Sequence, residues 1–137
     1  DPRVTVIEGL NARHLTRDAL PDLGDGAAIV TIDVSFISLG LILPPLVDVT
    51  TPDVDVVALV KPQFEAGREA ARRGRGVIRD EETRALAIAS ARGSLEGAGF
   101  SIELEIDSAV RGPKGNLERF VWARRVEDVA SGSRGAR

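Results

Sequence analysis

Short apolar runs bounded by polar and turn residues predict strands that alternate with helices. Residues Ala27–Ile32 (AAIVTI) and 54–60 (VDVVALV) are almost continuously apolar, which is typical of parallel strands buried on both faces. Residues 3–7 (RVTVI) are short, apolar and β-branched and predict a further strand. The Gly-containing turn over residues 8–13 is expected to start a short helix. The first 60 residues therefore hold three predicted strands.

Two segments have the spacing of helices. Residues 36–47 place apolar side chains three or four positions apart, with Ser35 available as the N-cap and Pro44 expected to bend the end. These side chains are Phe36, Leu39, Leu43 and Leu46. Residues 81–96 predict an amphipathic helix that Asp80 caps and that ends near Gly97 or Gly99. Its expected inward side chains are Leu86, Ile88, Ala89 and Leu95. The first helix and the two buried strands form a βαβ unit, for which a right-handed crossover is expected.

The last third of the chain predicts an antiparallel hairpin at the edge of the sheet. Residues 101–106 (SIELEI) alternate strictly, which favours a strand with one solvated face. A turn cluster over residues 111–116 leads into 118–124 (ERFVWAR), the last predicted strand. From Val126 onward the tail of Ser, Gly, Arg and Ala is expected to be unstructured. The fold class is therefore α/β with a mixed sheet, in one domain over residues 1–125.

Composition narrows the class of protein. The chain has 137 residues, 43% of them hydrophobic and 28% charged, which fits one globular domain. Its longest apolar stretch, residues 38–47, is too short to span a bilayer and contains two prolines. With no cysteine and with His14 as its one histidine, the sequence predicts no disulfide and no metal site. These features favour a soluble, cytoplasmic protein. Because it has no methionine and begins at Asp1, we expect the chain to be part of a longer one.

Basic charge is concentrated in one segment although the net charge is -3. Residues 66–79 carry five arginines against Glu69 alone, which predicts a loop that faces phosphates. The arginines are Arg68, Arg72, Arg73, Arg75 and Arg79. The alternative is a surface loop whose arginines are simply solvated. Of the 18 basic residues, only Lys61 and Lys114 are lysines, and a lysine, unlike an arginine, can lose its proton near neutral pH.

Three ionisable residues follow or precede predicted strands, where open α/β sheets bind ligands. Asp33 and Lys61 each come directly after a buried strand, and Glu118 follows the Gly-rich turn before the last strand. Each has an ordinary alternative: Asp33 as a helix cap, Lys61 as a solvated strand end, Glu118 as an ion-pair partner. Together, a carboxylate and a lysine at adjacent strand ends form an acid/base pair that can take a proton from a hydroxyl.

Four motifs resemble the TlyA family, whose members are often called haemolysin A and are related to the FtsJ ribose methyltransferases. The motifs are residues 31–39 (TIDVSFISL), 59–68 (LVKPQFEAGR), 76–80 (GVIRD) and 112–118 (GPKGNLE). The resemblance runs from about Asp1 to Arg125, in order and with gaps like those of the family. Four motifs in sequence are far more specific than any one of them.

This resemblance implies a Rossmann-like class I methyltransferase fold and S-adenosylmethionine-dependent 2'-O-methylation of cytidine in ribosomal RNA. Related enzymes use a Lys-Asp-Lys-Glu tetrad, in which Asp33 matches the Asp, Lys61 the second Lys and Glu118 the Glu. The family places the first Lys upstream of Asp1. A ribose hydroxyl needs a base to become a good nucleophile, and a neutral lysine can serve as one. Because the sulfonium methyl is already activated, the reaction needs no metal.

Part of the family's cofactor site has no counterpart in the sequence. The family has a Gly-rich loop after its first strand and an acidic residue ending its second, and no GxGxxG occurs here. By resemblance, residues 3–7 are the third strand, so we expect an incomplete fold that lacks two strands, their helices and an RNA-binding S4 module. The remaining cofactor contacts are expected at Glu8, Asn11, Ala12 and Arg13.

Three expectations follow for this chain by itself. It is expected to bind S-adenosylmethionine weakly and to be inactive. Its residues 3–7 are expected to be displaced, exchanged between chains or paired with Ala27–Ile32, whose uncovered edge also invites pairing with a second copy. The alternatives to an enzyme are a membrane-active haemolysin, which the absence of a spanning segment disfavours, and a non-catalytic fragment that binds RNA or a partner.

Overall fold

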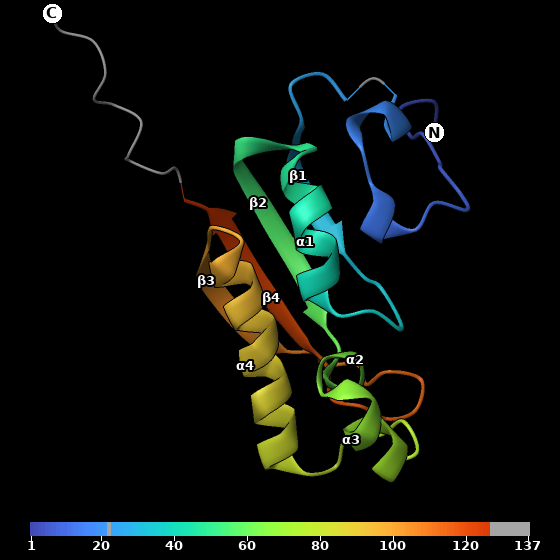
Figure 1. The fold of residues 1–137 in the computed structure, drawn as a ribbon, viewed down its shortest axis with the longest axis vertical. Coiled ribbons are helices and arrows are strands. Elements are labelled where there is room, and N and C mark those ends of the chain that lie inside the picture. Colours follow the sequence, from blue (N-terminus) through green and yellow to red (C-terminus); the bar gives the residue numbers. More distant parts are fainter. Residues whose placement is uncertain (22, 127–137) are drawn as a thin grey trace, which may run out of the picture.

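The computed structural model describes residues 1–21 and 23–126, which form a mixed four-stranded sheet with helices on one face (Figure 1). The strand order is β1-β2-β4-β3, with β1 and β2 parallel and the other neighbours antiparallel. The strands are β1 (Ala27–Ile32), β2 (Thr50–Val60), β3 (Phe100–Asp107) and β4 (Arg119–Arg125). The helices are η1 (Ala12–His14), η2 (Arg17–Ala19), α1 (Leu39–Val47), α2 (Pro62–Glu65), α3 (Gly67–Arg73) and α4 (Glu81–Gly97). The predicted α/β class, parallel pair and C-terminal hairpin are confirmed.

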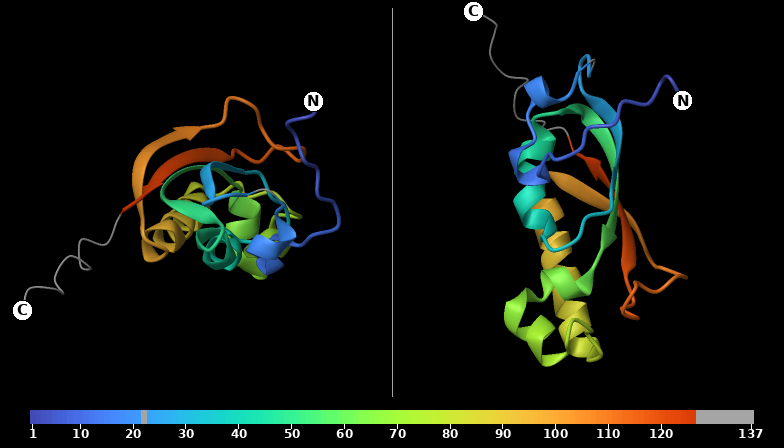
Figure 2. Two further views of the ribbon diagram at one scale, coloured as in Figure 1. Left: turned by 90° about the horizontal axis from the view of Figure 1, so that it is seen from above. Right: turned by 90° about the vertical axis from the view of Figure 1, so that its right-hand side faces the viewer.

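The core lies between the sheet and helices α1 and α4, which cover the same face (Figure 2). Alternate side chains of β2 point into this core: Val54, Val56, Ala58 and Val60 are fully buried. The side chains between them, such as Val57 and Leu59, are only half-buried. The prediction that these strands are buried on both faces is therefore wrong, because no helix of the described residues covers the second face.

The uncovered face carries apolar side chains from three strands. Ile29 of β1 is 72% exposed, Leu104 and Ile106 of β3 are 57% and 60% exposed, and Phe120 of β4 is 39% exposed. Ile106 and Phe120 are cross-strand partners. The predicted solvated face of β3 is thus confirmed, but it holds apolar residues, while Glu105 forms an ion pair with Arg92 of α4 at 3.3 Å.

Helix α1 begins at Leu39, three residues later than the hydrophobic spacing predicts. Phe36 has φ +63°, a left-handed conformation that a helix cannot include, and its side chain is 90% exposed. Ser35 is therefore not the N-cap. The N–H of Leu39 instead donates to Glu65 Oε1 of α2 at 2.9 Å, so a distant carboxylate satisfies the first turn.

Helix α4 confirms the predicted limits and the predicted cap. Asp80 Oδ2 accepts from the Thr83 N–H at 2.8 Å. The predicted inward face is partly wrong, because Leu86 and Ala89 are exposed while Ile88 and Leu95 are buried. The stripe that packs on the sheet follows the helical period from Arg84 onward, and its members are Arg84, Ala87, Ile88, Ala91 and Leu95.

Residues 3–7 form no strand, which corrects the prediction from their β-branched pattern. Val4 and Val6 are 65% and 76% exposed, and the segment does not pair with β1. A strand forms only where a neighbour pairs with its N–H and C=O groups, and residues 3–7 do not take up the free edge of β1. Of the expected tail, Val126 donates its N–H to Gly99 O at 2.9 Å, and residues 127–137 lie outside the described part.

Candidate active site

The ends of β1 and β2 bring the first two candidate residues together. Because the strands are parallel, Asp33 and Lys61 leave the same edge of the sheet. Lys61 Nζ lies 2.7 Å from Asp33 Oδ1 and donates to Ser35 Oγ at 3.2 Å. The Lys61 side chain is 14% exposed, against 72% for Asp33. A largely buried amine is thus held by two oxygen acceptors from the loop after β1.

Glu118 lies immediately before β4 and is 5% exposed. Its Oε1 accepts a hydrogen bond from Gln63 Nε2 of α2 at 3.0 Å. Gly112 leaves room for this carboxylate, since a Cβ there would lie 2.6 Å from Glu118 Oε1. A larger residue at this position would displace the Glu118 carboxylate from its present place.

Lys61 and Glu118 line one cavity of about 930 Å³. Ser35, Phe36, Gln63 and Phe64 also line it, and the rings of Phe36 and Phe64 lie 5.0 Å apart between centroids. Its basic lining residues are Arg68, Arg72, Arg75 and Lys114. Asp33 is not among the lining residues and reaches the cavity through its ion pair with Lys61. The structure thus gathers all three predicted residues at one end of the sheet.

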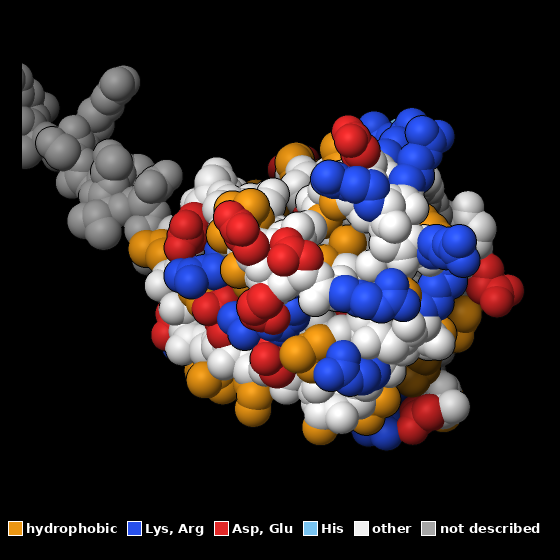
Figure 3. Space-filling view, turned by 90° about the horizontal axis from the view of Figure 1, so that it is seen from below, with side chains coloured by type: hydrophobic (Ala, Val, Ile, Leu, Met, Phe, Trp, Pro, Cys, Tyr) orange, Lys and Arg blue, Asp and Glu red, His pale blue; other side chains and the backbone are white. Residues whose placement is uncertain are grey.

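The five arginines of the basic segment are all exposed, but they divide between two hollows. Arg68, Arg72 and Arg75 line the cavity with Lys61, whereas Arg73 and Arg79 line a neighbouring hollow of about 450 Å³. On this end of the molecule, Lys and Arg side chains gather over the side of α2 and α3, and most acidic side chains lie on the other side (Figure 3). The basic surface is continuous with the cavity.

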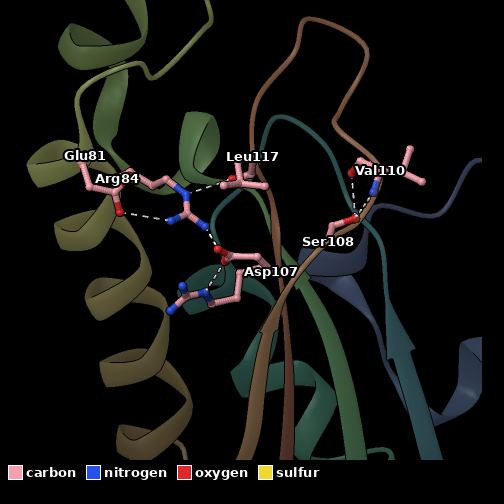
Figure 4. Close-up of polar contacts among 7 residues, drawn as sticks. Glu81, Arg84, Asp107, Ser108, Val110 and Leu117 are labelled. Carbon is pink, nitrogen blue, oxygen red and sulfur yellow. Dashed lines mark hydrogen bonds and ion pairs between the residues drawn. The ribbon is translucent and has the colours of Figure 1, made fainter.

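Two buried polar side chains hold the turn that carries Glu118. Asn116 donates to Gly76 O and accepts from the Ile78 N–H, both at 2.9 Å, which ties the basic segment to the turn. Arg84 of α4, 6% exposed, donates Nε–H to Leu117 O at 3.1 Å and pairs with Glu81 and Asp107 (Figure 4). The two residues that precede Glu118 are thus both held by hydrogen bonds.

Hydrogen bonds and burial shift the pKa values of two carboxyl groups, Asp107 near this turn and Glu65 near α1. The hydrogen bond from Arg119 lowers the pKa of Asp107 below its ordinary value, and the hydrogen bond from Arg84 acts in the same direction. Burial raises the pKa of Glu65, and the hydrogen bond from the Leu39 N–H only partly offsets this. Both groups act in the scaffold around the cavity and do not line it.

The predicted cofactor contacts lie apart from the cavity. Glu8, Asn11 and Arg13 are exposed, and Ala12 is half-buried where η1 packs against α1. Asn11 Oδ1 caps η1 by accepting from the Arg13 N–H at 3.0 Å. None of these four residues lines the cavity with Lys61.

Several cavity and scaffold residues were not identified from the sequence. They are Gln63, Asn116, Lys114 and Arg84. The sequence could have pointed to Gln63, Lys114 and Asn116, because they lie inside the four family motifs. Lys114 is also one of only two lysines. Arg84 carried no signal, because a buried arginine in a helix resembles a surface one in sequence.

Comparisons with known proteins match almost the whole chain. The sequence profile of the FtsJ-like methyltransferase family matches residues 1–125. The chain is 43% identical over 136 residues to the 16S/23S rRNA (cytidine-2'-O)-methyltransferase TlyA of Mycobacterium tuberculosis, covering 98% of this chain and 49% of that protein. It is 34% identical over 118 residues to Hemolysin A of Brachyspira hyodysenteriae, covering 86% and 48%. The chain thus spans about half the length of these curated relatives.

A solved structure agrees with these matches. The crystal structure of a protein named as a hemolysin from Lactococcus lactis superposes with a TM-score of 0.85 at 39% identity, over 92% of this chain and 59% of that one. The family match includes the two strand ends with Asp33 and Lys61 and the turn with Glu118. The resemblance seen in the four motifs is confirmed, and the chain belongs to the FtsJ-like methyltransferase family.

Proposed function

We propose that the intact protein carrying this chain transfers a methyl group from S-adenosylmethionine to the 2'-hydroxyl of cytidine in ribosomal RNA, in the cytoplasm. The observation that carries the proposal is the largely buried side chain of Lys61, which pairs with Asp33 and shares a basic cavity with Glu118. The name of the Mycobacterium tuberculosis relative gives the same reaction for that protein.

The three residues have distinct roles in this proposal. Lys61, as the neutral amine, takes the proton of the ribose hydroxyl, and proton transfer of this kind contributes about 10² to 10⁴ in rate. Asp33 orients the amine through their 2.7 Å contact. Glu118, buried and already bonded to Gln63, positions the hydroxyl. The cofactor, when bound, supplies a methyl group on a sulfonium centre.

The described residues fit the acceptor half of such a site and not the adenine half. The cavity provides a base, a carboxylate and cations, whereas no glycine-rich loop follows β1 or β2. Glu8, Asn11, Ala12 and Arg13 stay the proposed cofactor contacts from the resemblance, and they lie outside the cavity. We therefore place no step of the reaction on them.

The 137-residue chain alone is expected to bind S-adenosylmethionine weakly and to transfer no methyl group. A site without the Gly-rich loop and the acidic residue of its family is expected to retain too few contacts to order the cofactor. Isothermal titration calorimetry of this chain is expected to give no measurable heat up to a cofactor concentration of about 1 mM. A dissociation constant in the micromolar range would show that the chain holds a complete cofactor site.

Replacing Arg72, Arg73 and Arg75 together by alanine is expected to weaken RNA binding and to flatten its dependence on salt. All three are exposed on the basic surface. Each RNA phosphate that the variant fails to neutralise reduces the slope of log K against log[salt] by about 0.7 for single strands, so the slope should fall by about 2. Filter binding between about 50 and 300 mM salt measures this. Arg92→Gln on α4, outside both hollows, is the control, and an unchanged slope in the triple variant would assign the arginines to a solvated surface.

The proposed reaction is tested with the intact protein, labelled S-adenosylmethionine and ribosomal subunits. Digestion of the RNA to nucleosides should yield labelled 2'-O-methylcytidine. Absence of label in ribose would refute the reaction and leave a non-catalytic RNA- or partner-binding role.

A dye-leakage assay with vesicles tests the membrane activity that the name Hemolysin A states for one relative. No helix within residues 1–21 and 23–126 has the length and apolar character to cross a bilayer.

Self-association of this chain is proposed for the free edge of β1. Within the described sheet, β1 pairs only with β2, and Ile29 on it is 72% exposed. An apolar strand with an unpaired edge is a template for pairing with a second copy.

A further inference from the structure

Gln63 is a cavity residue to which the proposed reaction gives no role. It lies two residues after Lys61 on α2, and its side chain lines the cavity together with Lys61 and Glu118. Gln63 Nε2 donates to Glu118 Oε1 at 3.0 Å. This bond joins positions 55 apart in the chain, so it depends on the tertiary fold.

The other end of the same amide is unsatisfied. Gln63 Oε1 is buried and has no hydrogen-bond partner among the described residues. A buried acceptor without a donor costs free energy, and an apolar side chain of similar shape would avoid that cost. Gln63 is therefore a poor choice for packing alone, and what it provides is the N–H on Glu118.

The contact determines which oxygen of Glu118 is left for the cavity. Oε1 is taken by Gln63, whereas no hydrogen bond to Oε2 occurs among the described residues. Gly112, in the same β3–β4 connection, lies against this carboxylate, since a Cβ there would come within 2.6 Å of Oε1.

We propose that Gln63 is a positioning residue for methyl transfer, which holds the Glu118 carboxylate so that Oε2 accepts a hydrogen bond from the acceptor hydroxyl. This inference rests on the proposed function. Gln63 acts through Glu118 and needs no contact with substrate, which agrees with its buried Oε1. Its loss should therefore lower the rate of the chemical step and leave the binding of RNA unchanged.

Gln63→Met in the intact protein tests this inference. We expect kcat to fall about tenfold, with KM for RNA and for S-adenosylmethionine within about twofold of wild type. The thermal midpoint should change little, because the removal of the unpaired Gln63 oxygen offsets the loss of the donor to Glu118 Oε1. Gln63→Leu serves as a second variant if the methionine variant is poorly folded. Glu65→Gln changes the same short helix by one atom outside the cavity and should retain wild-type kinetics.

A double variant separates positioning from packing. If Gln63 acts through Glu118, adding Gln63→Met to Glu118→Gln should cause no further loss of kcat. Independent, additive losses, or a lower thermal midpoint with kcat unchanged, would overturn the inference. Wild-type kcat in both Gln63 variants would also overturn it and would leave the proposed reaction standing, provided that a Lys61 variant is inactive. An active Lys61 variant would instead count against the proposed roles of the site.

Discussion

Arginine in place of Lys61 is expected to abolish methyl transfer by the intact protein while its affinity for S-adenosylmethionine stays within about twofold of wild type. A guanidinium keeps its proton at any working pH, so it cannot accept one from a hydroxyl. It can still pair with Asp33, which lies 2.7 Å from the amine, so the site should stay ordered. The loss should reach at least the contribution of general-base catalysis, about 10² to 10⁴ in kcat.

Single-turnover transfer of labelled methyl to ribosomal subunits measures this effect, with cofactor affinity measured by calorimetry on the same sample. Arg92→Lys on α4 is the matched control. It is the reverse exchange, from arginine to lysine, at a position outside the cavity. Methylation by the Lys61→Arg variant at a rate near wild type would remove Lys61 from the role of base.

Arg84→Met is expected to lower the free energy of unfolding by about 1–2 kcal/mol, because it removes the donor to a part-buried carbonyl and a half-exposed ion pair with Asp107. The arginine side chain is 7% exposed and joins Leu117 O, Glu81 and Asp107 (Figure 4). Methionine keeps the apolar stem and leaves Leu117 O without this donor. Since Leu117 precedes Glu118, methyl transfer should fall as well.

Urea denaturation followed by circular dichroism measures the change in stability. Arg119→Met is the matched control: Arg119 also pairs with Asp107, but its side chain is 28% exposed and it has no contact with Leu117 O. This variant should lower the free energy of unfolding by less than about 1 kcal/mol. Equal losses in the two variants would show that Asp107 alone carries the effect, and no loss in Arg84→Met would show that the buried contacts add no net stability.

Local patterns predicted the elements whose partners are present in the chain. The apolar run of β1 and the Asp80 cap of α4 are found where the sequence places them. Residues 3–7 have an equally clear strand pattern and form none, because a strand also depends on a neighbour that the pattern does not specify. Phe36 continues the helical spacing of α1, but its positive φ excludes it from the helix.

The residues of the candidate site also fall into those that the sequence predicts and those that it does not. Asp33 and Lys61 could be paired from sequence, because parallel strands bring their carboxyl ends together. Glu118 was placed with them chiefly by the family resemblance. The contacts that hold it could not be predicted, since Gln63 and Asn116 reach across 55 and 38 positions of the chain, and no local pattern encodes such distances.

The uncovered face of the sheet has a consequence for every melting experiment on this chain. Ile29, Leu104 and Ile106 remain largely in water. Association of two copies that removes these side chains from water would therefore stabilise the folded chain. By mass action, the apparent midpoint then rises with protein concentration. Variants such as Arg84→Met are therefore comparable only at one matched concentration, and a dilution series reveals the stability of the solitary molecule.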